Sequence, residues 1–212
     1  MLKIKSFTFS PIQENTYIVY HSSGKCMIVD PGCYYDSEKD ALAAFIAEKG
    51  LKPVLLVNTH CHLDHVFGNK FIAETYDLTL HIHPSEQALL KMAPASGLMY
   101  NLPFDNYNGE LRFIEPGNTL DVAGELLDIL FTPGHSPGSL SFYNKGAGFV
   151  LSGDALFSGS IGRTDLLGGD YDTLIASIRT QLFTLPEETI VYSGHGPETS
   201  VRVEKLSNPF LK

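Results

Sequence analysis

The segment PVLLVNTHCHLDH, residues 53–65, joins an apolar run to a dense group of metal-binding side chains. His60, His62, Asp64 and His65 fall within six residues, although the whole chain holds only eight histidines. A packed core would have to satisfy every nitrogen of these rings, and a solvated loop would gain nothing from grouping them. Clustered histidine and aspartate side chains therefore indicate a cation site directly after a predicted strand.

The same pattern, an apolar run that stops at a polar loop, occurs three more times. The segments ELLDILFTPGHSPG (125–138), GFVLSGDALF (148–157) and TIVYSGHGPE (189–198) end in loops that carry His135, Asp154 and His195. Loops that follow strand ends on one edge of a sheet can meet there. The flanking Gly and Pro residues favour tight turns that hold short side chains at fixed points. We expect these four loops to converge on one site.

The ligand types and their number predict the chemistry of that site. The spacing of His60 and His62 differs from the i, i+4 pair of a helical metal motif and suits an extended loop. Imidazole and carboxylate ligands without thiolate favour Zn, Fe, Mn or Co. Seven candidate ligands exceed the four of one tetrahedral site, which suggests two metals that share a carboxylate. Such a pair predicts hydrolysis by a metal-bridging hydroxide; the alternative is a buried polar network that only fixes the loops.

Composition and charge narrow the classes of protein. A chain of 212 residues with 43% hydrophobic and 18% charged residues is expected to fold as one domain, residues 1–212. The formal charge of −9 argues against a nucleic-acid partner, which needs clustered Lys and Arg. Bound metals would still allow a small anionic substrate in a local cleft.

The N-terminal segment and the cysteines bear on the cellular compartment. Residues 1–20 alternate apolar with polar residues and lack the apolar run of a signal peptide, and no segment reaches transmembrane length. Cys26, Cys33 and Cys61 form no CxxC pair, which suits a reducing compartment. We expect a cytoplasmic protein with no membrane partner.

Periodicity and capping signals predict the secondary structure. Alternating residues predict strands at 2–9, 16–20 and 26–29, and a capping box at Ser37 predicts a helix that ends near Gly50. Further helices are expected at 67–76, 84–92, 171–183 and 200–206. Residues 94–109, rich in Pro, Gly, Asn and aromatics, predict a long loop that either covers the cleft or packs as an ordinary connection.

The motif HCHLDH, followed by His135, Asp154 and His195, resembles the HxHxDH signature of the metallo-β-lactamase superfamily. The resemblance implies an α/β protein with an αββα sandwich fold. It also implies one metal on His60, His62 and His135, a second on Asp64, His65 and His195, and Asp154 bridging the two. Asp30, in VDPG, resembles the residue that this superfamily keeps near the site to orient a ligand.

The segment SGDALFSGSIGRTDLLGGD, residues 152–170, is similar to glyoxalase II, in particular to its short members with GRTD in this loop. This similarity implies hydrolysis of a thioester such as S-lactoylglutathione, with Asp64 and Asp154 as catalytic carboxylates. Arg163 would contact a glutathione carboxylate; alternatively it pairs with Asp165 or Asp170 to hold the loop. Two divalent metals are expected, zinc first, with iron or manganese accepted by the same ligands.

Departures from related families define the alternatives. Longer glyoxalase II enzymes add a helical substrate domain, which residues 196–212 are too few to form, and the best-known lactam-hydrolysing subclass resembles HxHxDR rather than HxHxDH. Persulfide dioxygenases resemble this chain too and would use one iron on His60, His135 and Asp154. A third alternative is a metal-binding or partner-binding module without catalysis.

Three other residues resemble site residues by type. His81 and His83 are two apart on a predicted strand face, and we interpret them as surface residues near a strand end. Cys61, inside the motif, is interpreted as a small filler rather than a nucleophile.

Overall fold

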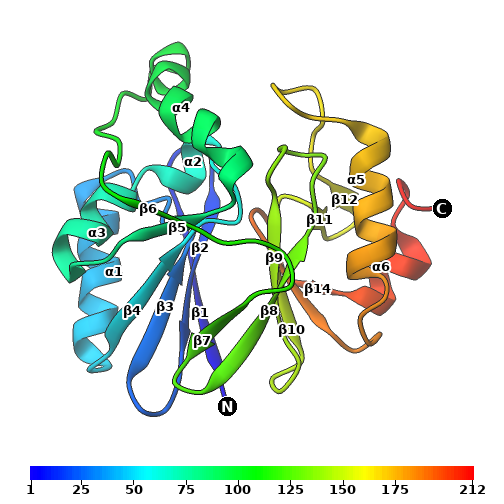
Figure 1. Cartoon of the computed structure of the whole chain (residues 1–212), viewed down its shortest axis with the longest axis horizontal. Helices are drawn as coiled ribbons and strands as arrows, with labels where there is room; N and C mark the ends of the chain where they lie inside the picture. Colours follow the sequence, from blue (N-terminus) through cyan, green and yellow to red (C-terminus); the bar gives the residue numbers. More distant parts are fainter.

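The computed structural model describes all 212 residues and consists of two six-stranded sheets packed face to face (Figure 1). The first sheet has the order β1 (Lys3–Phe9), β2 (Glu14–Tyr20), β3 (Lys25–Val29), β4 (Lys52–Val57), β5 (Leu80–Ile82) and β6 (Leu111–Phe113). The second has the order β14 (Thr199–Ser200), β13 (Ile190–Ser193), β10 (Phe149–Gly153), β9 (Leu140–Asn144), β8 (Glu125–Phe131) and β7 (Thr119–Val122). A short hairpin of β11 (Leu156–Phe157) and β12 (Ser160–Ile161) stands apart from both.

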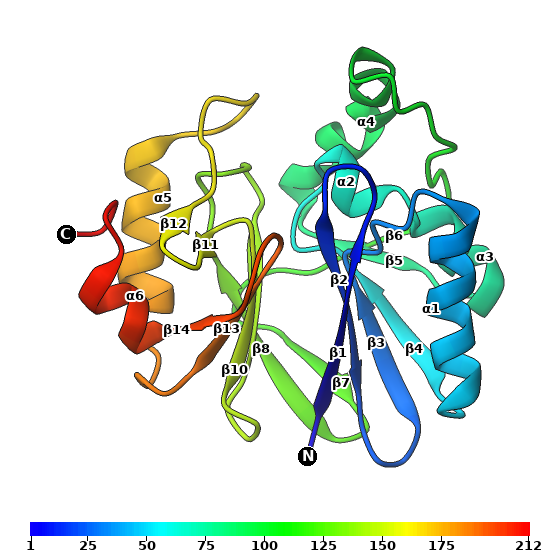
Figure 2. The same cartoon turned by 180° about the vertical axis from the view of Figure 1, so that it is seen from behind.

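Helices cover the outer face of each sheet, as the view from behind also shows (Figure 2). The first sheet carries α1 (Asp36–Glu48), α2 (Leu63–Val66), α3 (Asn69–Tyr76) and α4 (Gln87–Met99), the last preceded by a 3₁₀ turn (Pro84–Glu86). The second carries α5 (Tyr171–Ser177), which continues as a π-helical turn (Ile178–Leu182), and α6 (Val201–Ser207). The expected αββα sandwich is confirmed. None of these helices combines the length and the apolar character needed to cross a membrane.

Strands β2 and β3 of the first sheet are buried on both faces. In β2, Ile18 belongs to the core between the sheet and its helices, whereas Tyr17 and Val19 belong to the core between the two sheets. Met27 and Val29 of β3 follow the same inward pattern. This alternation is the period of two that a strand imposes, so successive side chains face the helices and the second sheet in turn.

The four ligand-bearing loops leave strands that end at one edge of the sandwich. In the second sheet, β10 and β13 are parallel, and β8 runs in the same direction because β9 is antiparallel to both β8 and β10. The loop after β4 joins them across the sheets, since Leu140 N–H donates to the Thr59 carbonyl at 2.9 Å. The expected convergence of the loops is confirmed.

Most of the predicted elements are confirmed, with one corrected boundary in the first helix. The prediction that Ser37 begins the capping box was wrong. Helix α1 starts at Asp36 after the cap residue Tyr35, and Glu38 accepts hydrogen bonds from the backbone N–H of Tyr34 (2.7 Å) and Tyr35 (3.0 Å). The aromatic residue can cap here because the Glu38 carboxylate satisfies the free backbone donors.

The predicted loop at 94–109 was wrong for its first part, because α4 continues through Pro94 to Met99. Proline has no N–H to donate to the carbonyl of Leu90, four residues earlier. Asn106 supplies the missing donor: its Nδ2 lies 2.8 Å from the Leu90 carbonyl oxygen. The returning segment therefore stabilises the helix that Pro94 would otherwise interrupt.

Candidate metal centre

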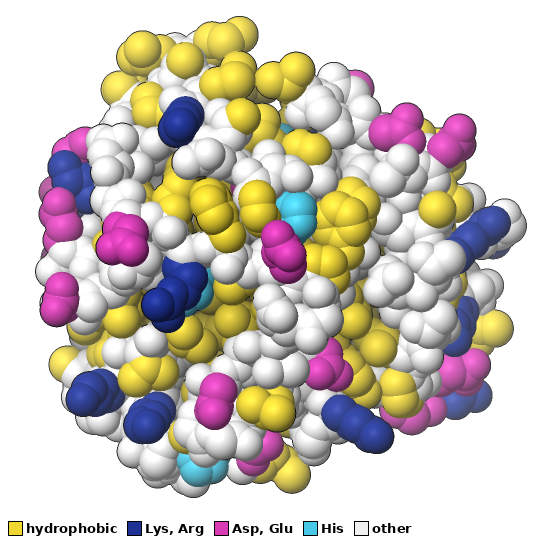
Figure 3. Space-filling model, in the orientation of Figure 1, with side chains coloured by type: hydrophobic (Ala, Val, Ile, Leu, Met, Phe, Trp, Pro, Cys, Tyr) yellow, Lys and Arg dark blue, Asp and Glu magenta, His cyan; other side chains and the backbone are white.

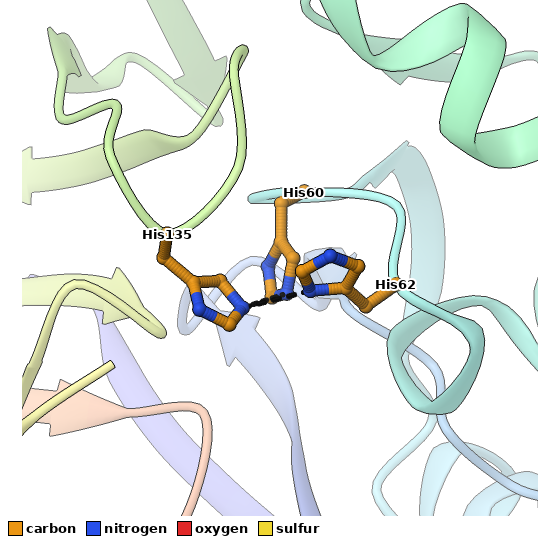
Figure 4. Close-up of side chains that lie close together, drawn as sticks. All are labelled: His60, His62 and His135. Atoms are coloured by element: carbon orange, nitrogen blue, oxygen red, sulfur yellow. Dashed lines mark hydrogen bonds between the residues drawn. The ribbon is translucent and has the colours of Figure 1, made fainter. Parts of the chain in front are cut away.

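Three histidine rings meet where the loops after β4 and β8 face each other (Figure 4). His135 Nε2 lies 2.8 Å from His62 Nδ1 and 3.2 Å from His60 Nε2. Ligand nitrogens on a tetrahedral zinc at ordinary bond lengths are separated by about 3.3 Å. The three nitrogens are therefore close to the spacing that one cation requires.

A second group forms beside the first from Asp64, His65 and His195. The Oδ2 atom of Asp64 lies 3.1 Å from His195 Nε2 and 3.8 Å from His65 Nε2. The side chains come from α2 and from the loop after β13, so this group also joins the two halves of the sandwich. It offers two imidazoles and one carboxylate to a cation.

Asp154 lies between the two groups. Its Oδ2 is 3.4 Å from His135 Nε2 in the first group and 3.6 Å from His195 Nε2 in the second, and its Oδ1 is 3.4 Å from His65 Nε2. Gly194 makes this position possible, because a Cβ there would lie 2.1 Å from Asp154 Oδ1. One carboxylate can thus reach cations in both groups.

The hydrogen bonds of the outer ring nitrogens orient the histidines. His135 Nδ1 donates to the Arg163 carbonyl at 2.7 Å and His195 Nδ1 to the Gln13 carbonyl at 3.1 Å; a carbonyl can only accept, so Nε2 of each neutral ring keeps its lone pair for the site. His60 Nδ1 faces Thr59 Oγ1 at 3.1 Å. His62 differs, since its Nδ1 points into the site.

Asp30 lies next to His65 of the second group and holds the loop before it. Its carboxylate accepts hydrogen bonds from Thr59 N–H (2.7 Å), Thr59 Oγ1 (2.6 Å) and Asn58 Nδ2 (3.2 Å), and its Oδ2 lies 3.1 Å from His65 Nδ1. Asp30, His60 and His65 also lie close enough to form a ligand group. Because these hydrogen bonds already occupy both Asp30 oxygens, the structure favours the orienting role that the sequence suggested.

Buried polar atoms without partners provide a test of whether the residues fit metal ions. His65 Nε2 and Asp154 Oδ1 are buried and make no hydrogen bond. Unsatisfied buried groups are costly and uncommon in folded proteins. Both atoms point toward the space between the two ligand groups, where cations would satisfy them. The donor set and its geometry therefore fit two divalent metals.

Burial and charge shift the pKa values of the two groups in opposite directions. Burial lowers the pKa of His60, and it lowers the pKa of His62 to about 3. Burial also opposes charge on His65, but the carboxylates of Asp154, Asp64 and Asp30 outweigh it and raise the pKa of that ring well above its usual value. Two rings of the first group, His60 and His62, are thus held neutral, whereas His65 in the second group binds a proton more readily than a free imidazole.

Glu86 is a site residue that the sequence analysis missed. This fully buried carboxylate accepts hydrogen bonds from Cys61 N–H (2.7 Å), Gly138 N–H (2.7 Å) and Ser136 Oγ (2.8 Å). It therefore ties the loop of His60 and His62 to the loop of His135. A glutamate at the start of a predicted helix is usually exposed, and nothing in the sequence around it signals this role.

Cys61 and His83 lie where their interpretations placed them, but the interpretation of His81 as a surface residue was wrong, because only 8% of it is exposed. His81 donates to backbone carbonyls from β5, and His83 stacks on Phe131 with ring centroids 5.0 Å apart; neither belongs to a ligand group. Cys61 is buried in the core of the first sheet, where burial raises the pKa of its thiol. It packs as the small filler that was predicted.

Arg163 lines the cleft and pairs with one acidic neighbour. Its guanidinium donates to both carboxylate oxygens of Asp165, at 2.7 and 2.8 Å, whereas Asp170 instead caps α5 through Thr173 N–H. Both partners of this ion pair are exposed, so it contributes little to stability and can exchange for another carboxylate.

The ligand groups open into a cavity of about 620 Å³. His62, Asp64, His135, Asp154 and His195 form its floor. The volume lies in the range of small-molecule sites, so the centre is accessible to a substrate.

Comparisons with known proteins agree with this geometry. Residues 10–195 match the family model described as the metallo-beta-lactamase superfamily. The chain is 42% identical to a probable metallo-hydrolase, YqgX, of Bacillus subtilis, over 99% of this chain and 98% of that protein. It is 34% identical to the hydroxyacylglutathione hydrolase GloC of Haemophilus influenzae, again over 99% and 98%.

Solved structures give the same relationship. The crystal structure of the B3 metallo-beta-lactamase BLEG-1 superposes with a TM-score of 0.91 at 36% identity, covering 99% of this chain and all of that one. The crystal structure of TTHA1623 in a di-iron-bound form superposes with a TM-score of 0.88 at 38% identity, covering 98% and 100%.

Proposed function

The chain belongs to the metallo-β-lactamase superfamily, and from that premise we propose that it hydrolyses a thioester such as S-lactoylglutathione with two divalent metals. The observation that carries the proposal is the position of Asp154 between two three-residue ligand groups. The Haemophilus influenzae relative, named a hydroxyacylglutathione hydrolase, supports the choice of thioester.

The proposed roles of the residues follow from their positions. His60, His62 and His135 hold one metal, Asp64, His65 and His195 hold the other, and Asp154 contacts both. When bound, divalent metals lower the pKa of a water molecule and stabilise negative charge on a carbonyl oxygen. We propose zinc first, with iron and manganese as alternatives; the di-iron form of TTHA1623 supports testing iron.

The protein side chains would orient the substrate and handle the proton. Asp64 and Asp154 are the two carboxylates on the cavity floor, where they can accept the proton of the attacking water. Water adds to the thioester carbonyl, the carbon–sulfur bond breaks, and the thiolate leaves without a strong general acid. Arg163, at the cavity wall, would bind a carboxylate of the thiol carrier in place of Asp165.

The test is hydrolysis of S-lactoylglutathione by protein loaded separately with zinc, manganese or iron. We expect turnover that is lost in Asp154→Ala together with one of two bound metal equivalents. Full metal content and unchanged rates in that variant would exclude the bridging role. A β-lactam is assayed in parallel, since the BLEG-1 structure is described as a lactamase.

A persulfide dioxygenase is the second candidate, because the site contains a two-histidine, one-carboxylate set. His135 Nε2 lies 3.2 Å from His60 Nε2 and 3.4 Å from Asp154 Oδ2, which allows one iron to bind all three. Oxygen uptake with glutathione persulfide, without thioester hydrolysis, would establish this reading in place of the first.

A further inference from the structure

The cavity above the metal ligands is mainly apolar. Twelve of its twenty lining residues are hydrophobic, and Arg163 is its only charged residue outside the ligand groups. The acidic partner Asp165 already pairs with that guanidinium. The walls therefore offer few charged partners to a polar or multiply charged acyl group and a large contact area to an apolar one.

Two walls supply this apolar surface, one from each half of the sandwich (Figure 1). The first wall follows α4 and consists of Leu89, Met92, Ala93, Ser96, Met99 and Tyr100. The second wall follows the β11–β12 hairpin and the loop after it, and consists of Phe157, Ile161, Leu166 and Leu167. The metal ligands lie on the floor between the two walls, so a group bound against either wall is continuous with the reacting centre.

Several side chains of these walls are exposed although they are large and hydrophobic. Met99 is 86% exposed, Leu167 65%, Tyr100 57% and Met92 46%. Hydrophobic side chains gather over α4 on the face shown in Figure 3. Clustered exposed apolar residues beside a site mark a binding surface, and methionine adapts its shape to flexible chains.

We propose that the substrate is a thioester with an extended apolar acyl group, which lies between the α4 wall and the β11–β12 wall while its carbonyl reaches the floor. This inference rests on the proposed thioesterase function and names the acyl class that the site selects. An apolar acyl chain removes the exposed surface of both walls from water, whereas a lactoyl group is too short and too polar to cover it.

The experiment uses one thiol and varies only the acyl group. The metal-loaded enzyme is assayed with S-lactoyl-, S-butanoyl-, S-hexanoyl- and S-octanoylglutathione, so Arg163 meets the same carrier each time. We expect kcat/KM to rise about fourfold per methylene between butanoyl and octanoyl, as burial of a CH₂ group predicts. A flat or falling series with cleavage of S-lactoylglutathione would overturn the inference and leave the thioesterase function standing. No cleavage of any member would refute the thioesterase function itself.

Substitutions in the two walls test whether these residues cause the preference for long acyl groups. Leu167→Glu and Met99→Glu should lower the ratio of kcat/KM for the octanoyl substrate to kcat/KM for S-lactoylglutathione about tenfold or more. Leu206→Glu is the matched control, since Leu206 is 74% exposed on α6 and does not line the cavity. Equal effects of the wall and control substitutions would show that the walls do not bind the acyl chain.

Discussion

Single ionisable side chains make the two ligand groups unequal. Burial keeps the pKa of His60 and His62 low, so these rings stay neutral at neutral pH. Burial also disfavours charge on His195, but its hydrogen bond to Asp64 and the nearby Asp154 raise the pKa of that ring, and the same carboxylates act on His65. A proton must leave the second group before a metal can bind there.

The first prediction is a pH-dependent order of metal loading. A histidine with a raised pKa loses its proton only as the pH rises, so affinity at the second group should rise toward pH 8, by up to about tenfold per pH unit for each proton released. The first group, in which His60 and His62 have lowered pKa values, should bind zinc with a smaller change in affinity between pH 6 and pH 8. Zinc titrations against a chromophoric chelator at pH 6, 7 and 8 measure binding at both groups.

His195→Ala should remove only the pH-dependent binding at the second group. Parallel weakening of zinc binding at both groups in this variant would contradict the assignment.

The second prediction concerns Glu86, which positions ligands without contacting the metal. Glu86→Gln replaces one acceptor oxygen by an NH₂ group, which must then face the N–H of Cys61 or the donors at Ser136 and Gly138. We expect zinc affinity at the three-histidine group to fall about tenfold or more. Competition with a chelator measures this, and Glu188→Gln, at an 84% exposed side chain, is the control. Unchanged zinc affinity in Glu86→Gln would show that Glu86 does not position the metal ligands.

The grouping of the candidate ligands could be predicted from sequence, because it depends on residue type and on position after an apolar run. Glu86 was not, because its role depends on two loops that only the folded chain brings together. The same holds for the carbonyls of Arg163 and Gln13, which orient His135 and His195 through backbone atoms that every residue carries. Residue identity carries no signal for such contacts.

At the scale of elements, α4 depends on a side chain outside the helix. Asn106→Ala should leave the Leu90 carbonyl without the donor that replaces Pro94 N–H. A buried carbonyl that loses its partner costs about 1–3 kcal/mol. Urea unfolding should show this loss, whereas Asn118→Ala at an exposed position should leave the midpoint unchanged. Equal urea midpoints for the two variants would show that Asn106 does not stabilise α4.

Local propensity could not predict α4 beyond Pro94, because the compensating donor comes from the segment that follows the helix.

The turn that presents His135 requires glycine before it. Gly134 has φ +122°, and a Cβ there would lie 2.3 Å from the Leu174 backbone nitrogen of α5. Gly134→Ala should therefore force the turn away from α5, lower the melting temperature and weaken metal binding. Gly148→Ala is the control: its φ of +69° carries a backbone cost of about 1 kcal/mol, but the added Cβ meets no neighbour. Similar losses in both variants would show that the backbone dihedral, and not the contact with α5, decides the effect.

At the scale of the whole molecule, periodicity predicted half-buried strands but not their partition between two sheets. The side chains of β2 and β3 are buried on both faces, so their sequence alone does not name the neighbouring layer. The sandwich followed from the resemblance of the HxHxDH motif and its later ligands. In the structure, each ligand group takes side chains from both halves of the sandwich.

Metal ions should therefore stabilise the contact between the halves. His60, His62, Asp64 and His65 belong to the first half, and the other three ligands, His135, Asp154 and His195, belong to the second. Ligand binding to the folded state at 100 to 1,000 times Kd adds about 3–4 kcal/mol, which for a chain of this size corresponds to a shift on the order of 10 °C. We expect chelation to lower the melting temperature by on the order of 10 °C and to increase hydrogen exchange in the loops after β4, β8, β10 and β13.

Asp154→Ala, which lacks the shared carboxylate, should show a smaller shift of the melting temperature on chelation. An unchanged melting temperature, with metal removal verified by elemental analysis, would contradict this prediction. It would mean that the packing of the two sheets alone holds the halves together and that the ligand loops are preformed without metal.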